Sequence, residues 1–187
     1  MRDRQPTLAH PSVHLRPATA EDWTALFAAA SDPAIWAGHP AHDRWQEPTF
    51  RAFFEQGLAS GGMLVAIEPG SGTIIGTSRY DLARASAGEV EIGWTFLVRR
   101  HWGGTTNPVM KALMVGYALE QVERVVFVIG ETNMRSRTAI ERIGAVPTDR
   151  QLAVQLSTGP SNHVFYAIDR AAFGAGPLAP LWAQRLR

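Results

Sequence analysis

The chain has 187 residues, and its 18 basic and 17 acidic side chains leave a net charge of +1 at pH 7. This length suits one domain with a sizeable core, and the charge balance provides no global basic field for nucleic acid or for an anionic membrane surface. The chain has no cysteine, which excludes disulfide scaffolds, zinc ribbons and thiol nucleophiles and suits a reducing compartment.

No apolar segment has the length that a signal peptide or a membrane helix needs. Residues 1–11 are polar, and the longest apolar runs, 63–67 and 125–129, are the length of single strands. We therefore expect a cytoplasmic protein. Lys111 is the only lysine among the basic residues. We interpret the excess of arginine as compositional bias, with the further possibility that some arginines bind anions through forked hydrogen bonds.

The N-terminal half predicts a tail, a strand, two helices and a strand meander. Thr19, three residues before Asp22, forms an approximate capping box, and Pro48 suits the first turn of a helix. Residues 69–72 have the composition of a hairpin turn. In chain order we expect a tail over 1–12, a strand over 13–17, a helix from about 19, a break at 31–33, an irregular segment over 34–46, a helix from 48, and strands over 63–68, 73–79 and 89–98.

The C-terminal half predicts a strand–helix–strand crossover. The run 125–129 is apolar at every position, as expected of a central strand covered on both faces. In chain order we expect a loop over 99–107, a helix from 108, a strand over 125–129, a helix over 132–144, strands over about 150–157 and 162–169, and a weak helix in the tail 171–187. The whole order predicts an α+β domain over residues 13–170, with a twisted, mixed, mostly antiparallel sheet of about six to seven strands, a central parallel pair and flanking helices.

The segment 89–107 has the composition of an anion site. Gly103 and Gly104 let the backbone approach a ligand closely, and the free amides of the following helix favour an anion. Arg99, Arg100 and His101 add positive charge. A tight strand-to-helix turn with solvated arginines remains an alternative. The P-loop and dinucleotide-binding glycine patterns are both absent.

The order of elements and two short motifs resemble the GNAT acetyltransferase superfamily. The sequence from Arg100 to Thr105, RHWGGT, is similar to the family's acetyl-CoA loop Q/R-x-x-G-x-G/A. Asn133-Met-Arg-Ser136, followed by the run 139–144, resembles the second motif N-x-x-S…A-x-x-x-x-G-F. The early run 15–19 and the break at 31–33 resemble the RimJ/RimL branch, which acetylates ribosomal-protein N-termini. The chain departs from the family at Thr105, and at Ile140, where many members have a tyrosine that protonates the leaving thiolate.

The resemblance implies an acetyl-CoA-dependent N-acetyltransferase that moves the acetyl group directly to an amine, either a protein N-terminus or a small molecule. It implies a monomer or homodimer without a metal. A non-catalytic acyl-CoA-binding domain is the alternative. The donor is expected to be held by Phe96, Leu97, Val98, Arg99, Arg100, Trp102, Gly103, Gly104, Thr105, Thr106, Asn107, Asn133 and Arg137. The acceptor is expected to contact Trp36, His39, Trp45, Arg79 and Tyr80, of which Trp36 and Trp45 are equally consistent with core anchors. A plain helix cap is the alternative for Asn133.

The same resemblance makes Glu91 and Ser136 the catalytic candidates. Glu91, on the strand that leads into the loop, is the expected general base. Glu89 lies on the same face by period-two alternation and is the second choice. Ser136 is the nearest polar group to the missing tyrosine. A solvated or ion-paired carboxylate is the alternative for both glutamates. His39 and His42 have metal-ligand spacing, but two histidines without a third ligand indicate a metal only weakly.

Overall fold

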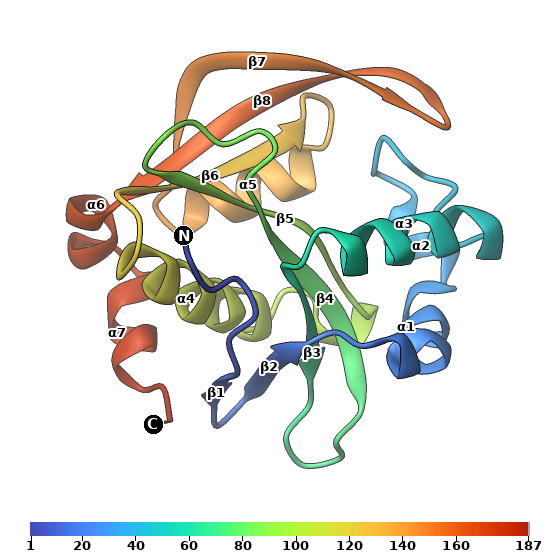
Figure 1. Cartoon of the computed structure of the whole chain (residues 1–187), viewed down its shortest axis with the longest axis horizontal. Coiled ribbons are helices and arrows are strands. Elements are labelled where there is room, and N and C mark those ends of the chain that lie inside the picture. The colour runs from blue at the N-terminus through green and yellow to red at the C-terminus, as the bar shows by residue number, and fades with distance from the viewer. Residues whose placement is uncertain (187) are drawn as a thin grey trace.

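An eight-stranded mixed sheet forms the centre of the computed structural model, which describes residues 1–186 (Figure 1). The strands are β1 (Leu8–His10), β2 (Val13–Pro17), β3 (Met63–Ile67), β4 (Ile74–Asp81), β5 (Glu89–Leu97), β6 (Arg124–Gly130), β7 (Val146–Leu156) and β8 (Gly159–Asp169), in the spatial order β1-β2-β3-β4-β5-β6-β8-β7. Only β5 and β6 pair in parallel. The prediction of a mostly antiparallel sheet with a central parallel pair is confirmed.

The helices lie on both faces of this sheet. They are α1 (Trp23–Ala30), α2 (Pro33–Trp36), α3 (Glu47–Ala59), α4 (Thr106–Leu119), α5 (Met134–Arg142), α6 (Arg170–Ala175) and α7 (Leu178–Ala183). The predicted capping box forms: the Asp22 carboxylate accepts a hydrogen bond from the Thr19 amide at 2.9 Å. No helix within residues 1–186 is long and apolar enough to cross a bilayer.

Two large apolar cores follow from the alternation of strand side chains, and a small third cluster gathers Val126, Phe165 and Ala167. Leu64 and Ala66 of β3 face the core shared with α4 and α5, whereas Met63 and Val65 face the core shared with α1 and α3. This is the period-two pattern of a sheet that is covered on both faces. The sheet therefore holds β5 rigidly between two packed layers.

The two segments expected to be tails are structured. Leu8 pairs with Leu15 across β1 and β2, which raises the number of strands from the expected six or seven to eight. At the other end, α7 packs on α4, and a Cβ added to Gly116 would lie 2.4 Å from the Trp182 ring. Both segments order because they bury apolar side chains: Leu8 and Leu178 are 9% and 1% exposed. The helix α4 also begins two residues before Pro108, at Thr106.

Candidate active site

The parallel strands β5 and β6 part after three paired positions. Glu89, Val90 and Glu91 pair with residues 124–126, and no pairing continues beyond them. The cause lies in β5, where Trp94 has a φ of 51° and the register with β4 shifts between Thr77 and Arg79. Such a bulge bends the strand away from its neighbour. The parting leaves a V-shaped opening in the middle of the sheet.

The edge of β5 that borders this opening has backbone groups with no strand partner. The amide of Val98 donates to the carbonyl of Ile75 at 2.9 Å, so by the alternation of an antiparallel ladder Phe96 also faces β4. Thr95 and Leu97 therefore direct their backbone groups toward β6. The Leu97 carbonyl accepts a hydrogen bond from the indole Nε1 of Trp102 at 2.8 Å. An extended ligand could pair with this edge as an added strand.

A cavity of about 650 Å³ occupies the opening. Residues 92–97 of β5 and 127–130 of β6 form its two sides, α5 covers one end, and α4 and the segment around α2 complete the wall. The hairpin β7–β8 reaches the same region, since Thr158 donates to the Pro40 carbonyl at 2.6 Å (Figure 1). The cavity thus joins segments from both halves of the chain.

The loop between β5 and α4 lies at the mouth of the cavity. Residues 99–101 form a 3₁₀ turn, and Gly103 has a φ of 71°, a conformation that favours glycine. Helix α4 follows with first-turn amides that have no intrahelical acceptor. Trp102, Gly103 and Asn107 line the cavity. Arg99 and Arg100 are exposed and pair with carboxylates of Asp32 and Glu68.

Other residues expected to hold the donor are divided between the cavity wall and the loop. Phe96, Leu97 and Asn133 line the cavity, as does the catalytic candidate Ser136. Val98, Gly104 and Thr105 belong to the loop that enters α4, and Thr106 is the first residue of α4; none of them lines the cavity.

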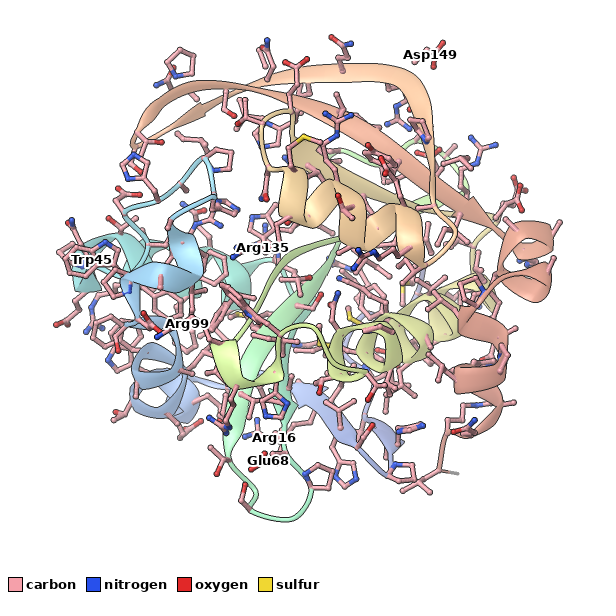
Figure 2. The ribbon with its side chains drawn as sticks, turned by 180° about the vertical axis from the view of Figure 1, so that it is seen from behind. Arg16, Trp45, Glu68, Arg99, Arg135 and Asp149 are labelled. Atoms are coloured by element: carbon pink, nitrogen blue, oxygen red, sulfur yellow. The ribbon has the colours of Figure 1, made fainter. Side chains whose placement is uncertain are left out.

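The N-terminus of α5 faces the loop across the cavity. Asn133 is the helix cap, because its Oδ1 accepts a hydrogen bond from the Ser136 amide at 3.2 Å. Arg137 does not line the cavity; its guanidinium donates to the Tyr166 hydroxyl and to the Glu131 carbonyl. Arg135 lies there instead, with its guanidinium 4.2 Å from the Trp102 ring centroid (Figure 2). Of these two arginines at the start of α5, only Arg135 lines the cavity.

Glu91 is fully buried beside the cavity. Its carboxylate accepts two hydrogen bonds from the Arg84 guanidinium, at 2.9 and 2.5 Å. A Cβ added to the cavity-lining Gly93 would lie 2.9 Å from Glu91 Oε1, so the carboxylate reaches along the strand toward the cavity. Burial raises the pKa of Glu91 to about 7, against the opposing effect of Arg84.

Glu89 has a different setting on the same face. It pairs with Arg150 at 2.7 Å and with Arg124 at 3.7 Å, and it accepts a hydrogen bond from the Ser86 amide. Although burial acts to raise the pKa of Glu89, the Ser86 amide and the arginines outweigh it and hold the pKa below its ordinary value. A carboxylate so stabilised in its ionised form is a weak base.

The residues expected to contact the acceptor are not all brought together. Trp36 and His39 line the cavity, whereas Trp45 lies at the edge of the molecule with 39% of its surface exposed (Figure 2). Arg79 is buried against the Trp94 ring, 3.5 Å from its centroid. Tyr80 is placed in the core and not at the acceptor site, because its side chain faces α4 and its hydroxyl donates to the Met114 carbonyl at 2.7 Å.

Two histidines in the cavity have opposite hydrogen-bonding roles. The Nδ1 of His39 accepts from the Ala41 amide at 2.9 Å, which leaves Nε2 as a donor. The Nδ1 of His163 lies 3.2 Å from the Ser161 carbonyl and must donate to it, which leaves Nε2 as an acceptor. Burial lowers the pKa of both rings, that of His39 to about 3, so both are neutral at pH 7. Nothing in the sequence pattern indicated His163, because a long separation along the chain divides it from the loop.

Lys111, the only lysine of the chain, also lines the cavity. It lies on α4, is 3% exposed, and donates a hydrogen bond to Thr95 Oγ1 at 2.7 Å. Within residues 1–186 no group of three or more potential ligands gathers to hold a metal ion, and His39 uses one ring nitrogen within its own loop.

The sequence profile described as "Acetyltransferase (GNAT) domain" matches residues 12–146. The chain therefore belongs to the GNAT acetyltransferase family. The resemblance seen in the loop and the element order is thereby confirmed at the level of the family. No curated protein sequence matches the chain significantly.

Solved structures have the same fold. A GCN5-related N-acetyltransferase from Brucella melitensis superposes with a TM-score of 0.79 and 17% identity, over 98% of this chain and 86% of that one. A putative acetyltransferase from T. thermophilus has a TM-score of 0.78 and 23% identity, over 98% of both chains. Mycobacterium smegmatis RimJ, solved with CoA-disulfide, has a TM-score of 0.71 and 15% identity, over 96% of this chain and 94% of that one. At these identities the likeness shows the fold.

Proposed function

We propose that the protein is an acetyl-CoA-dependent N-acetyltransferase that transfers the acetyl group directly to an amine. The observation that carries the proposal is the parting of β5 and β6 over a cavity that continues to the free amides of α4. An extended pantetheine arm could pair with the open edge of β5 as an added strand. A phosphate group could bind at the N-terminus of α4. Membership of the GNAT family supports the same interpretation.

The donor end is formed mainly by backbone groups. Thr95 and Leu97 supply the open strand edge, and residues 103–107 supply the glycine loop and the first helical turn. Arg99 and Arg100 stand exposed at this mouth, where their charges favour the pyrophosphate of the donor. Pairing at the Leu97 carbonyl requires the Trp102 indole to release it. The residues present therefore suit CoA without any metal ligand.

Glu91 is the proposed general base. The ammonium form of the acceptor must lose a proton before its nitrogen can attack, and a base with a pKa near the working pH accepts that proton best. Burial brings Glu91 into that range, and its carboxylate lies beside Gly93 of the cavity wall. Because Arg84 occupies both carboxylate oxygens, the proton reaches Glu91 through water or after Arg84 moves. The Nε2 of His163 is the second candidate, since it is a neutral acceptor in the same cavity.

The proposed acceptor is a protein N-terminus, with a small-molecule amine as the second possibility. An α-amine has a pKa of about 8 and is partly neutral at physiological pH, so a base of modest strength is sufficient. The resemblance of the N-terminal segment to the RimJ/RimL branch and the fold likeness to RimJ support a peptide. Trp36 and His39 border the end of the cavity where such an acceptor would enter.

The test is an acceptor screen with detection of free thiol. Wild-type protein is offered acetyl-CoA with a panel of peptides differing in their first residue and a panel of small amines. The proposal predicts thiol release that depends on one class of amine, with a matching mass increase of the acceptor. Binding of CoA by calorimetry without thiol release for any amine would instead favour the non-catalytic domain. Absence of CoA binding would overturn both.

A further inference from the structure

The departing thiolate needs a proton or a positive charge, and the tyrosines of the chain do not supply it. The Tyr80 hydroxyl donates to the Met114 carbonyl, and the Tyr117 hydroxyl donates to Asp3. The Tyr166 hydroxyl donates to Glu141. None of the three tyrosines, which are all of those in the sequence, lines the cavity. The position where the family motif has tyrosine is Ile140, an apolar residue of the cavity wall.

Lys111 is the buried cation among the three basic side chains of residues 1–186 that line the cavity, which are Lys111, Arg135 and Arg142. Its ammonium donates to Thr95 Oγ1 at 2.7 Å and lies 3.5 Å from Ser78 Oγ, so β4 and β5 contribute only hydroxyls. On the β6 side it lies 5.7 Å from the centroid of the Phe127 ring. No carboxylate pairs with it within residues 1–186. A buried cation of this kind is costly unless an anionic partner arrives.

We propose that Lys111 is a catalytic residue that stabilises and protonates the leaving thiolate of CoA. The inference rests on the proposed function. Thr95, the hydrogen-bond partner of Lys111, belongs to the open edge of β5 along which the donor is proposed to lie. Both residues line the cavity. The thiolate would supply the negative charge that the protein itself does not place beside Lys111.

Each bond and proton in the proposed step has a source and a destination. The acceptor nitrogen forms a bond to the thioester carbonyl carbon, and the carbon–sulfur bond then breaks. The sulfur takes a proton from the Lys111 ammonium, which becomes a neutral amine. The proton lost by the acceptor nitrogen passes to the base and then to solvent, and Lys111 regains a proton from solvent before the next turnover. The products are an N-acetyl amide and the free thiol.

The pKa of Lys111 allows it to release a proton and take one up again near neutral pH. Burial alone lowers the pKa of Lys111 to about 7, so at neutral pH the ammonium and the amine are both populated. The other titratable or cationic groups that line the cavity are His39, His101, Arg135, Arg142 and His163. His39 and His163 are neutral at pH 7, so they are poor proton donors.

The test measures the ionisation of bound CoA and needs no acceptor. Wild type, Lys111→Met and the control Arg142→Met are first titrated with CoA by calorimetry. Methionine matches the length of lysine and suits a buried site, so Lys111→Met should fold at least as well as wild type. Arg142 also lines the cavity, but it is exposed, and its charge is therefore screened by water.

The thiolate of bound CoA is then followed by ultraviolet difference absorption against pH. A cation close to a thiolate lowers the pKa of the thiol by about 1 unit or more. Wild type and Arg142→Met should show this lowering, and Lys111→Met should lose it while still binding CoA. Equal thiol pKa values in wild type and Lys111→Met would overturn the role of Lys111 alone, whereas absence of CoA binding by wild type would overturn the proposed function as well.

The same samples distinguish an acid from a nucleophile. Because Lys111 is the only lysine, any acetyl-lysine formed on incubation with acetyl-CoA must lie at this position. The proposal predicts that the peptide containing Lys111 keeps its unmodified mass during turnover. A stoichiometric acetyl adduct on that peptide would overturn it in favour of a covalent intermediate.

Discussion

The two ends of the cavity are built by different means. The proposed donor end consists of a strand edge, a glycine loop and a helix start that follow one another between residues 93 and 111. The proposed acceptor end is bordered by α2 and His39 on one side and by His163 of β8 on the other, which are far apart in the sequence. On the proposed assignment, donor recognition depends on backbone geometry, whereas acceptor chemistry depends on which side chains the fold brings together.

Replacement of the proposed base gives the largest expected effect. Glu91→Gln should lower kcat by about 100-fold or more, because a general base contributes roughly that factor, while the Kd for CoA stays unchanged. Glu89→Gln is the matched control, since Glu89 is a buried, ion-paired carboxylate of the same strand that is held ionised. Rates measured against pH check the assignment.

An unchanged pH–rate profile in Glu91→Gln would contradict that assignment. Loss of the acidic limb, on which the rate rises with pH as the base loses its proton, in His163→Gln instead would transfer the role to His163. In either case the result would concern only the acceptor end.

Lys111 should make the stability of the fold depend on pH. Its pKa is about 7 in the folded state and about 10.5 when unfolded, so between these values the unfolded chain binds more protons and stability rises with pH. Lys111→Met should therefore be more stable than wild type near pH 7, by up to a few kcal/mol, and the gap should shrink toward pH 10. Urea unfolding of both proteins at several pH values measures it; a gap that does not change with pH would contradict the buried charge.

The glycine loop should control donor affinity through its conformation. Gly103→Ala places a side chain at a φ of 71°, which costs about 1 to 2 kcal/mol, so CoA should bind about tenfold more weakly. Gly72→Ala is the control, because Gly72 has a similar φ of 69° in the β3–β4 hairpin. Calorimetry with CoA distinguishes the two variants. Equal affinities would show that the loop does not hold the donor.

Loss of the contact between the β7–β8 turn and the segment after α2 should have the smallest effect. Thr158→Val removes the hydrogen bond to the Pro40 carbonyl, which is worth about 1 kcal/mol. We expect KM for the acceptor to rise about threefold, with no change in the Kd for CoA. Steady-state kinetics in the active acceptor class measure both. A change in donor affinity instead would break the division between the two ends.

The sequence signals for the proposed donor end are local. The loop from Arg100 to Thr105, the helix start and the strand before it occur in one stretch of chain, and the structure places them around the cavity. The acceptor end was harder to predict. Arg79 and Tyr80 are neighbours on one strand, so they face opposite sides of the sheet, and Tyr80 enters the core. His163 meets β6 only through the antiparallel pairing of β8.

The packing of the chain ends was beyond local pattern reading, although the helix expected in the tail 171–187 has a counterpart in α6 and α7. Trp182 packs against Gly116. The two residues lie in different segments, so no hydrophobic period in the sequence predicts their contact. The pairing of Leu8 with Leu15 likewise depends on a short reversal that the polar composition around it obscured. In both cases burial of apolar side chains decided the structure.

The central claim is that the donor lies along the open edge of β5. Amide hydrogen exchange, measured for wild type with and without CoA, tests it most directly. The amides of Thr95 and Leu97 face the opening, so bound CoA should slow their exchange, while the Phe96 amide, already directed to β4, should change little. Binding of CoA with unchanged exchange at Thr95 and Leu97 would contradict the claim.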